Sequence, residues 1–128
     1  PVMPASLIVE GCAQTAGILV GHAEEFREKV ILAKVGRFEL ERDAFPGQTL
    51  RYTAAIQQMD KVGAATSGTI ELLEHGPTGT TVAVVGRIDL MFSHLDNNMS
   101  GEKFPEHNFV FGESFKTLLR SSGVAGAW

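Results

Sequence analysis

The stretch from Ala5 to Gly21, ASLIVEGCAQTAGILVG, constrains this chain most, because as a helix it is apolar on nearly every side. Pro4 precedes it, and proline suits the first helical turn because amide groups there have no partner anyway. A helix that is apolar all round is buried rather than laid on a surface. Small residues such as Gly11 and Gly17 permit close approach of other backbone, although glycine costs about 1 kcal/mol against alanine in a helix interior. We therefore expect a buried helix that a sheet wraps.

Four segments rich in β-branched and aromatic residues follow the helix and predict strands. They span Val30–Phe38, Leu50–Met59, Ala64–Leu73 and Thr80–Phe92. Turn residues separate them, including a predicted hairpin loop over Glu74–Gly79. One helix followed by four strands in series indicates the α+β class with an antiparallel sheet.

The composition becomes more polar from Ser93 onward. Within this tail the pattern predicts a short amphipathic helix over Glu113–Ser121 that buries Phe115, Leu118 and Leu119. Gly123–Trp128 is expected to be frayed. No function is assigned to residues 93–128.

Length and composition limit the classes of protein. A chain of 128 residues fits a single domain, residues 1–128. Eleven basic against fifteen acidic residues, with no basic cluster, give no pull on nucleic acid. The longest apolar stretch is shorter than the roughly 20 residues of a membrane span and carries Glu10 and Gln14, so we expect no membrane insertion. We expect a soluble, cytoplasmic domain, in which the single Cys12 is an inert buried thiol.

Glu10 lies on the most apolar segment of the chain and is the first candidate for chemistry. Gln14 follows one helical turn later, so both side chains project from the same face. A carboxyl held in an apolar pocket can act as a general acid or base near neutral pH. The alternative is structural, with Glu10 capping neighbouring backbone or pointing into water at a dimer seam.

The order of residues resembles the (3R)-hydroxyacyl-acyl-carrier-protein dehydratase family of the FabA/FabZ type. The resemblance rests on Pro1-Val2-Met3-Pro4, then Leu7-Ile8-Val9-Glu10, then Ala13-Gln14, then Arg37-Phe38, Pro46-Gly47 and Leu50. It covers about residues 1–92, and the helix pattern is its most specific part.

The resemblance implies a hotdog fold, in which an antiparallel sheet wraps one long central helix. It implies a homodimer or a larger even-numbered homo-oligomer, with acyl tunnels at the subunit interface. The implied reaction, part of fatty acid biosynthesis, removes water from a 3-hydroxyacyl thioester on acyl carrier protein to give the trans-2-enoyl thioester, without metal or organic cofactor. Glu10 matches the family's catalytic acid, the backbone N–H of Ala5 matches the group that polarises the thioester carbonyl, and Gln14 matches a support for Glu10.

Two departures from the family matter. Ala5 stands where the family has glycine, and the family's histidine segment would lie before Pro1. We therefore expect the complete protein to extend N-terminally. The histidines of this chain, which lack any spacing typical of a site, are not expected to substitute; they are His22, His75, His94 and His107.

Two other functions stay open. A hotdog module without the histidine could bind acyl groups or assemble with partners without catalysing a reaction. A hotdog thioesterase would use a carboxylate to activate water. The residues encoded upstream of Pro1 would separate the dehydratase from the non-catalytic module.

Overall fold

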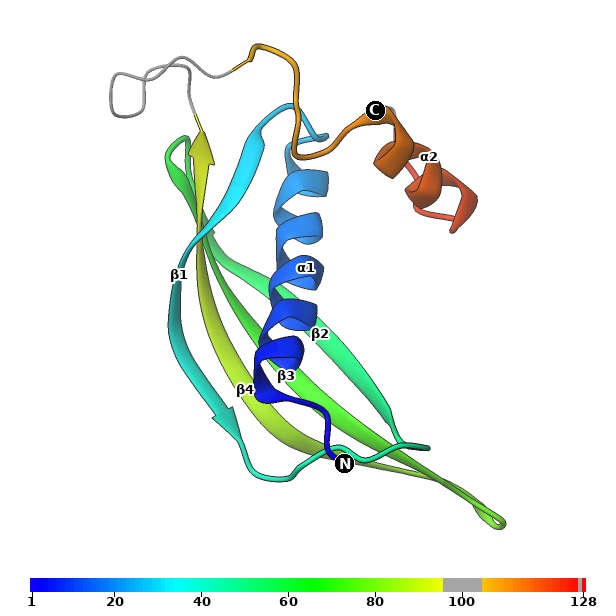
Figure 1. Ribbon diagram of the computed structural model, residues 1–128. Helices are drawn as coiled ribbons and strands as arrows, with labels where there is room; N and C mark the ends of the chain where they lie inside the picture. Colours follow the sequence, from blue (N-terminus) through cyan, green and yellow to red (C-terminus); the bar gives the residue numbers. More distant parts are fainter. Residues whose placement is uncertain (96–104, 127) are drawn as a thin grey trace.

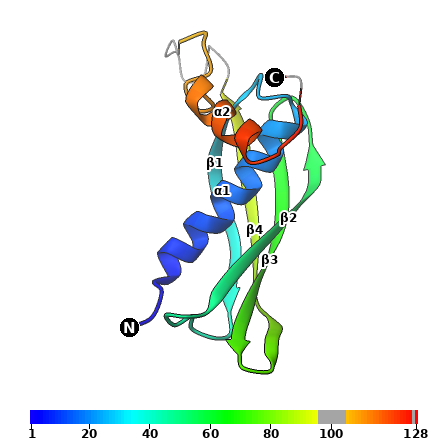
Figure 2. The same ribbon diagram turned by 90° about the vertical axis from the view of Figure 1, so that its right-hand side faces the viewer.

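The computed structural model, which describes residues 1–95, 105–126 and 128, shows one long helix against a curved antiparallel sheet (Figures 1 and 2). Along the chain the elements are α1 (Ala5–Ala23), β1 (Lys29–Leu40), β2 (Thr49–Met59), β3 (Gly63–Gly76), β4 (Gly79–Leu95) and α2 (Glu113–Ser121). The strands lie in the order β1-β4-β3-β2, and every neighbouring pair is antiparallel. The predicted helix, four strands and antiparallel sheet are thus confirmed.

The strand ends differ from the predicted ones where cross-strand pairing extends them. The predicted hairpin at Glu74–Gly79 is confirmed, but its loop is shorter than predicted, because β3 continues to Gly76 and β4 begins at Gly79. His75 lies opposite Thr80 in this ladder, and its Nδ1 lies 3.0 Å from the Thr80 hydroxyl. The β3–β4 ladder therefore continues through the polar residues of the hairpin to the pair Gly76 and Gly79.

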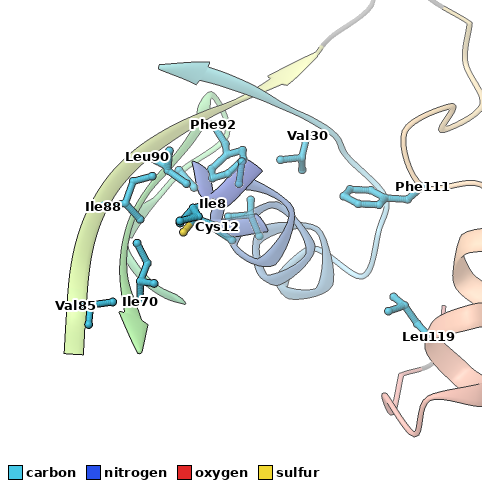
Figure 3. Close-up of a cluster of buried hydrophobic side chains, with 14 of the residues drawn as sticks. Ile8, Cys12, Val30, Ile70, Val85, Ile88, Leu90, Phe92, Phe111 and Leu119 are labelled. Atoms are coloured by element: carbon cyan, nitrogen blue, oxygen red, sulfur yellow. The ribbon is translucent and has the colours of Figure 1, made fainter. Parts of the chain in front are cut away.

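The core lies between the sheet and one face of α1 (Figure 3). Ile8, Cys12, Ala16 and Val20 recur every fourth residue and are all buried. They meet apolar side chains from the two central strands, namely Ile70, Leu72, Ile88, Leu90 and Phe92. Fully burying a side chain such as Ile8 contributes roughly 1.5–3 kcal/mol, so this face fixes how α1 sits on the sheet.

The expectation that α1 is buried all round is wrong in this chain. Leu7 is 54% exposed, and Glu10 and Gln14 are also exposed. The sheet curves around one side of the helix and leaves the other uncovered (Figure 2). The close approach at the helical glycines is also made by aromatic rings rather than by backbone: a Cβ on Gly11 would overlap the Tyr52 ring.

The C-terminal part packs beside the C-terminal end of α1 (Figure 1). The helix α2 has the predicted bounds, and Leu119 is buried as expected, whereas Leu118 is 61% exposed. The expectation of a frayed end is wrong, because the Trp128 ring packs edge-on against Phe26 with the centroids 4.8 Å apart. No helix of the described residues is long and apolar enough to cross a membrane.

Candidate functional site on the open side of α1

Glu10 and Gln14 form a pair on the uncovered side of α1. The Gln14 side-chain amide donates a 2.8 Å hydrogen bond from Nε2 to Glu10 Oε1. The predicted one-turn spacing is therefore a direct contact, and it leaves the second carboxylate oxygen of Glu10 without an intramolecular partner among the described residues. The expected burial of Glu10 is wrong in the isolated chain, since the sheet does not reach this face of the helix.

A groove of about 450 Å³ runs beside this pair, between α1 and β1. Apart from Glu10 and Gln14, its lining is apolar: Ala13, Gly17, Ile18, Val30, Leu32, Phe92, Val110, Phe111 and Phe115. One carboxylate and one amide thus face an otherwise apolar trough. Such an arrangement suits a ligand with a long apolar part and one polar, reacting end.

Ala5 is the first residue of α1 and is exposed. No side chain caps this end of the helix, and the Pro4 carbonyl accepts from Leu7 and Ile8 instead. No acceptor for the Ala5 amide occurs among the residues that the structure describes. Free N–H groups at a helix N-terminus favour negative charge, so this amide is available to a carbonyl oxygen.

Ala5 and Glu10 do not converge within one chain. Five residues separate them, which is about 7.5 Å along the axis and about 140° around it. Ala5 does not line the groove that contains Glu10. The structure therefore brings together Glu10 and Gln14, but leaves the Ala5 amide apart from them.

The four histidines are all away from the groove lining. His22 Nε2 lies 2.9 Å from the Ala125 carbonyl oxygen, and His75 lies in the β3–β4 hairpin between Thr49 and Thr80. His94 is buried near the end of β4, and His107 is exposed.

A larger depression of about 590 Å³ lies near the N-terminus of α1, beside β2. Its walls come from the first residues and the loop before β2, and include Val2, Met3, Phe45, Leu50 and Tyr52. Among the described residues, no carboxylate and no histidine line it. The lining that the structure describes is thus mainly apolar.

Cys12 lies on the covered side of α1 and is 4% exposed. Burial raises the pKa of its thiol from 9.0 to about 11. A buried thiol with a raised pKa is a poor nucleophile, because the thiolate is the reactive form. No group of three or more histidine, cysteine or carboxylate side chains that could hold a metal occurs in residues 1–95, 105–126 and 128.

Sequence reasoning missed the contribution of the C-terminal segment to the groove. Val110, Phe111 and Phe115 line it, although they lie about a hundred residues after Glu10 in the chain. The amphipathic pattern of α2 identified Phe115 as an inward-facing residue. Nothing in the sequence indicated which part of the molecule it would face.

The sequence matches a known protein family and several of its members. Residues 1–75 match the model of the FabA-like domain. The chain is 42% identical over 58 residues to a 3-hydroxyacyl-[acyl-carrier-protein] dehydratase FabZ of Solibacter usitatus, covering 44% of this chain and 36% of that protein. It is 31% identical over 99 residues to a FabZ of Herpetosiphon aurantiacus, covering 75% of this chain and 63% of that protein. The chain therefore spans less than two thirds of the length of these relatives.

Solved structures share its fold. A hexameric hotdog fold thioesterase of Campylobacter jejuni superposes with a TM-score of 0.64 at 13% identity, over 91% of this chain and 82% of that one. An acyl-CoA hydrolase from Staphylococcus aureus superposes with a TM-score of 0.64 at 15% identity, over 95% of this chain and 76% of that one. At such identities the likeness concerns the fold alone, and it confirms the predicted hotdog fold. The match over residues 1–75, with the FabZ relatives, leads to one conclusion: this chain belongs to the FabA-like family, that of the FabA/FabZ-type dehydratases.

Proposed function

We propose that this protein removes water from a 3-hydroxyacyl thioester carried on acyl carrier protein, giving the trans-2-enoyl thioester. The observation that carries the proposal is the Glu10–Gln14 pair opening on an apolar groove of about 450 Å³. A hydroxyacyl chain has the matching character, with polar reacting carbons at one end and an apolar tail. Membership of the dehydratase family supports the choice of reaction.

Glu10 is the group proposed to protonate the departing hydroxyl. Dehydration breaks one C–H bond beside the thioester carbonyl and one C–O bond at the next carbon, so the hydroxyl needs a proton and the C–H bond needs a base. The Gln14 amide, bonded to Oε1 of Glu10, orients a carboxyl that lines the groove and leaves its other oxygen free of intramolecular partners among the described residues. No described residue that lines the groove is a histidine. Glu10 is therefore assigned to the leaving hydroxyl, and the proton of the broken C–H bond would pass to the histidine of the segment that the resemblance places before Pro1.

A second copy of the chain is proposed to complete the site. The Ala5 amide, which would polarise the thioester carbonyl, is about 7.5 Å along the helix from Glu10 and on another face, so one chain does not present both to one substrate. The uncovered side also exposes large apolar side chains, with Leu7 54%, Leu32 42% and Val35 41% exposed. Exposed apolar patches of this kind mark interaction sites. A homodimer across this side would cover them and bring Ala5 of one copy toward Glu10 of the other.

The test is a dehydration assay with 3-hydroxyacyl-acyl-carrier-protein, following enoyl thioester formation. Two proteins are assayed: this chain, and the chain preceded by any residues that its gene encodes before Pro1. Each is compared with its own Glu10→Gln variant. Glu10→Gln keeps the side-chain shape and should lower the rate by roughly 10²–10⁴-fold, the usual contribution of a general acid. Glu41→Gln, which changes an exposed carboxylate outside the groove, is the matched control and should leave the rate unchanged.

The same assay separates the alternatives. Release of free carrier-protein thiol without enoyl product would indicate a thioesterase. Acyl binding without either product would indicate a non-catalytic module. Full activity in Glu10→Gln would remove Glu10 from the proposed chemistry.

A further inference from the structure

The C-terminal segment contributes part of the groove lining, and it lies outside the residues that match the FabA-like domain. The match ends at residue 75, whereas Val110, Phe111 and Phe115 line the groove. These residues do not belong to the part of the chain from which the reaction is inferred. Their position therefore requires an explanation of its own.

One stripe of α1 leads from the carboxylate to these aromatic side chains. Glu10, Gln14, Gly17 and Gly21 follow at spacings of three and four residues, so they line one side of the helix. A Cβ on Gly21 would lie only 2.6 Å from Cε2 of Phe111. The Phe111 ring thus occupies the space that a side chain at Gly21 would fill. Eleven residues separate Glu10 from Gly21, which is roughly 16 Å along the helix.

Asn108 holds this segment in place. Its Nδ2 donates to the backbone carbonyls of Phe26 at 2.8 Å and Glu28 at 3.0 Å. Its Oδ1 accepts from the amides of Val110 at 3.1 Å and Phe111 at 3.0 Å. One side chain therefore makes four hydrogen bonds that tie the residues before α2 to the turn between α1 and β1.

An aromatic cluster backs the segment on the side away from the sheet. Phe111 lies 4.9 Å from Phe26 and 5.3 Å from Phe115 between ring centroids, and Trp128 packs on Phe26. Figure 3 shows Phe111 beyond Val30, across α1 from Ile70 and Val85 of the sheet. Close aromatic packing of this kind resists displacement. The aromatic part of the groove lining is thus held by contacts on its far side.

We propose that Phe111 and Phe115 form an end wall that limits the length of the acyl chain this protein accepts. The inference rests on the proposed function, in which the acyl chain lies along the groove with its reacting carbons at Glu10. A tail shorter than the distance from Glu10 to the wall is buried fully. A longer tail has to displace aromatic rings or bend out of the groove. Methylene groups beyond this length therefore add nothing to the binding affinity.

Binding of saturated acyl-pantetheine thioesters of increasing length tests the wall without any reaction. Affinity, measured by calorimetry, should rise by about fourfold per buried methylene and then level off or fall once the tail meets the wall. Trp128 is the only tryptophan in the sequence, so its fluorescence should change as the tail reaches the cluster. Phe115→Ala should move the chain length at which affinity stops rising to longer chains, and Val110→Phe should move it to shorter ones.

Leu118→Ala is the matched control, since Leu118 lies on the same helix, is 61% exposed and does not line the groove. It should leave the length profile unchanged. Thermal unfolding checks that each variant is folded, and Phe115→Leu replaces Phe115→Ala if the larger deletion unfolds the protein. Identical profiles for the wild type and both wall variants would overturn the end wall, as would the absence of binding at every length. A shifted profile without dehydration would leave the wall standing and contradict the proposed reaction.

Discussion

The two sides of α1 differ in what they pack against and in what they carry. The covered side presents Ile8, Cys12 and Val20 to the central strands, and all three are buried. The open side presents Leu7, Glu10 and Gln14, which are exposed. A single helix thus serves as the core of the domain on one side and as the wall of a candidate site on the other. Glu10 and Gln14 thus lie on the part of this apolar helix that the sheet does not cover.

The glycines show the same difference at close range. On the β2 side, Gly11 lies directly under the Tyr52 ring, and a Cβ there would overlap it. On the open side, a Cβ on Gly17 would lie 3.3 Å from Phe92 Cε1 and meet nothing closer. Glycine is therefore required sterically at the first position, whereas at the second it leaves room in the groove.

The largest expected difference between the two sides is in core stability. Ile8→Ala should lower the free energy of unfolding by roughly 2–5 kcal/mol, because it removes a fully buried side chain and leaves a cavity. Leu7→Ala, one position along, should cost only about 0.5 kcal/mol in the monomer because Leu7 is already 54% exposed. Urea unfolding at low protein concentration measures both. Equal losses would mean that the open side is packed too.

The Cys12 thiol should make the covered side sensitive to high pH. Its pKa is raised by burial from 9.0 to about 11 in the folded chain. Below pH 9 the thiol is neutral in both states and its stabilising contribution is complete. That contribution is lost as pH rises toward 11, because the unfolded chain then gains by ionising.

The expected loss from Cys12 ionisation is on the order of 2 kcal/mol between pH 8 and pH 10.5. Urea unfolding at these two values, in the wild type and in Cys12→Ala, measures the loss together with the smaller effect of the Cys12 charge on the pKa of Tyr52, which burial and that charge both raise. The wild type should lose more stability than the variant. Equal losses would show that the thiol is not desolvated in the folded protein, and rapid alkylation at pH 8 would agree with that result.

The glycines of α1 give the smallest expected effect and the most local comparison. Gly17→Ala should stabilise the protein by roughly 0.5 kcal/mol, because alanine favours helix by about 1 kcal/mol and Phe92 has to yield only slightly. Gly11→Ala should destabilise it by about 1 kcal/mol, because displacement of Tyr52 outweighs the same gain. Thermal unfolding of the two variants should therefore give shifts of opposite sign. Two shifts of the same sign would indicate that Tyr52 moves freely.

Local patterns were sufficient for the elements and for one half of the candidate site. The apolar run with its small residues predicted α1, and β-branched segments predicted four strands. The one-turn spacing of Glu10 and Gln14 predicted that both project from the same face, where the structure shows them hydrogen-bonded. These features depend on residues that are neighbours in the chain, so periodicity reports them. The resemblance supplied the hotdog topology, which spacing by itself does not contain.

Tertiary structure alone decided which side of α1 the sheet leaves open and which C-terminal residues line the groove. The helix is apolar on nearly every side, so its pattern does not indicate the face that meets the strands. Asn108 reaches the carbonyls of Phe26 and Glu28, some eighty residues earlier, and thereby sets Phe111 against Gly21. Contacts between residues this far apart depend on the path of the whole chain, because burial and hydrogen-bond partners exist only after the chain has folded.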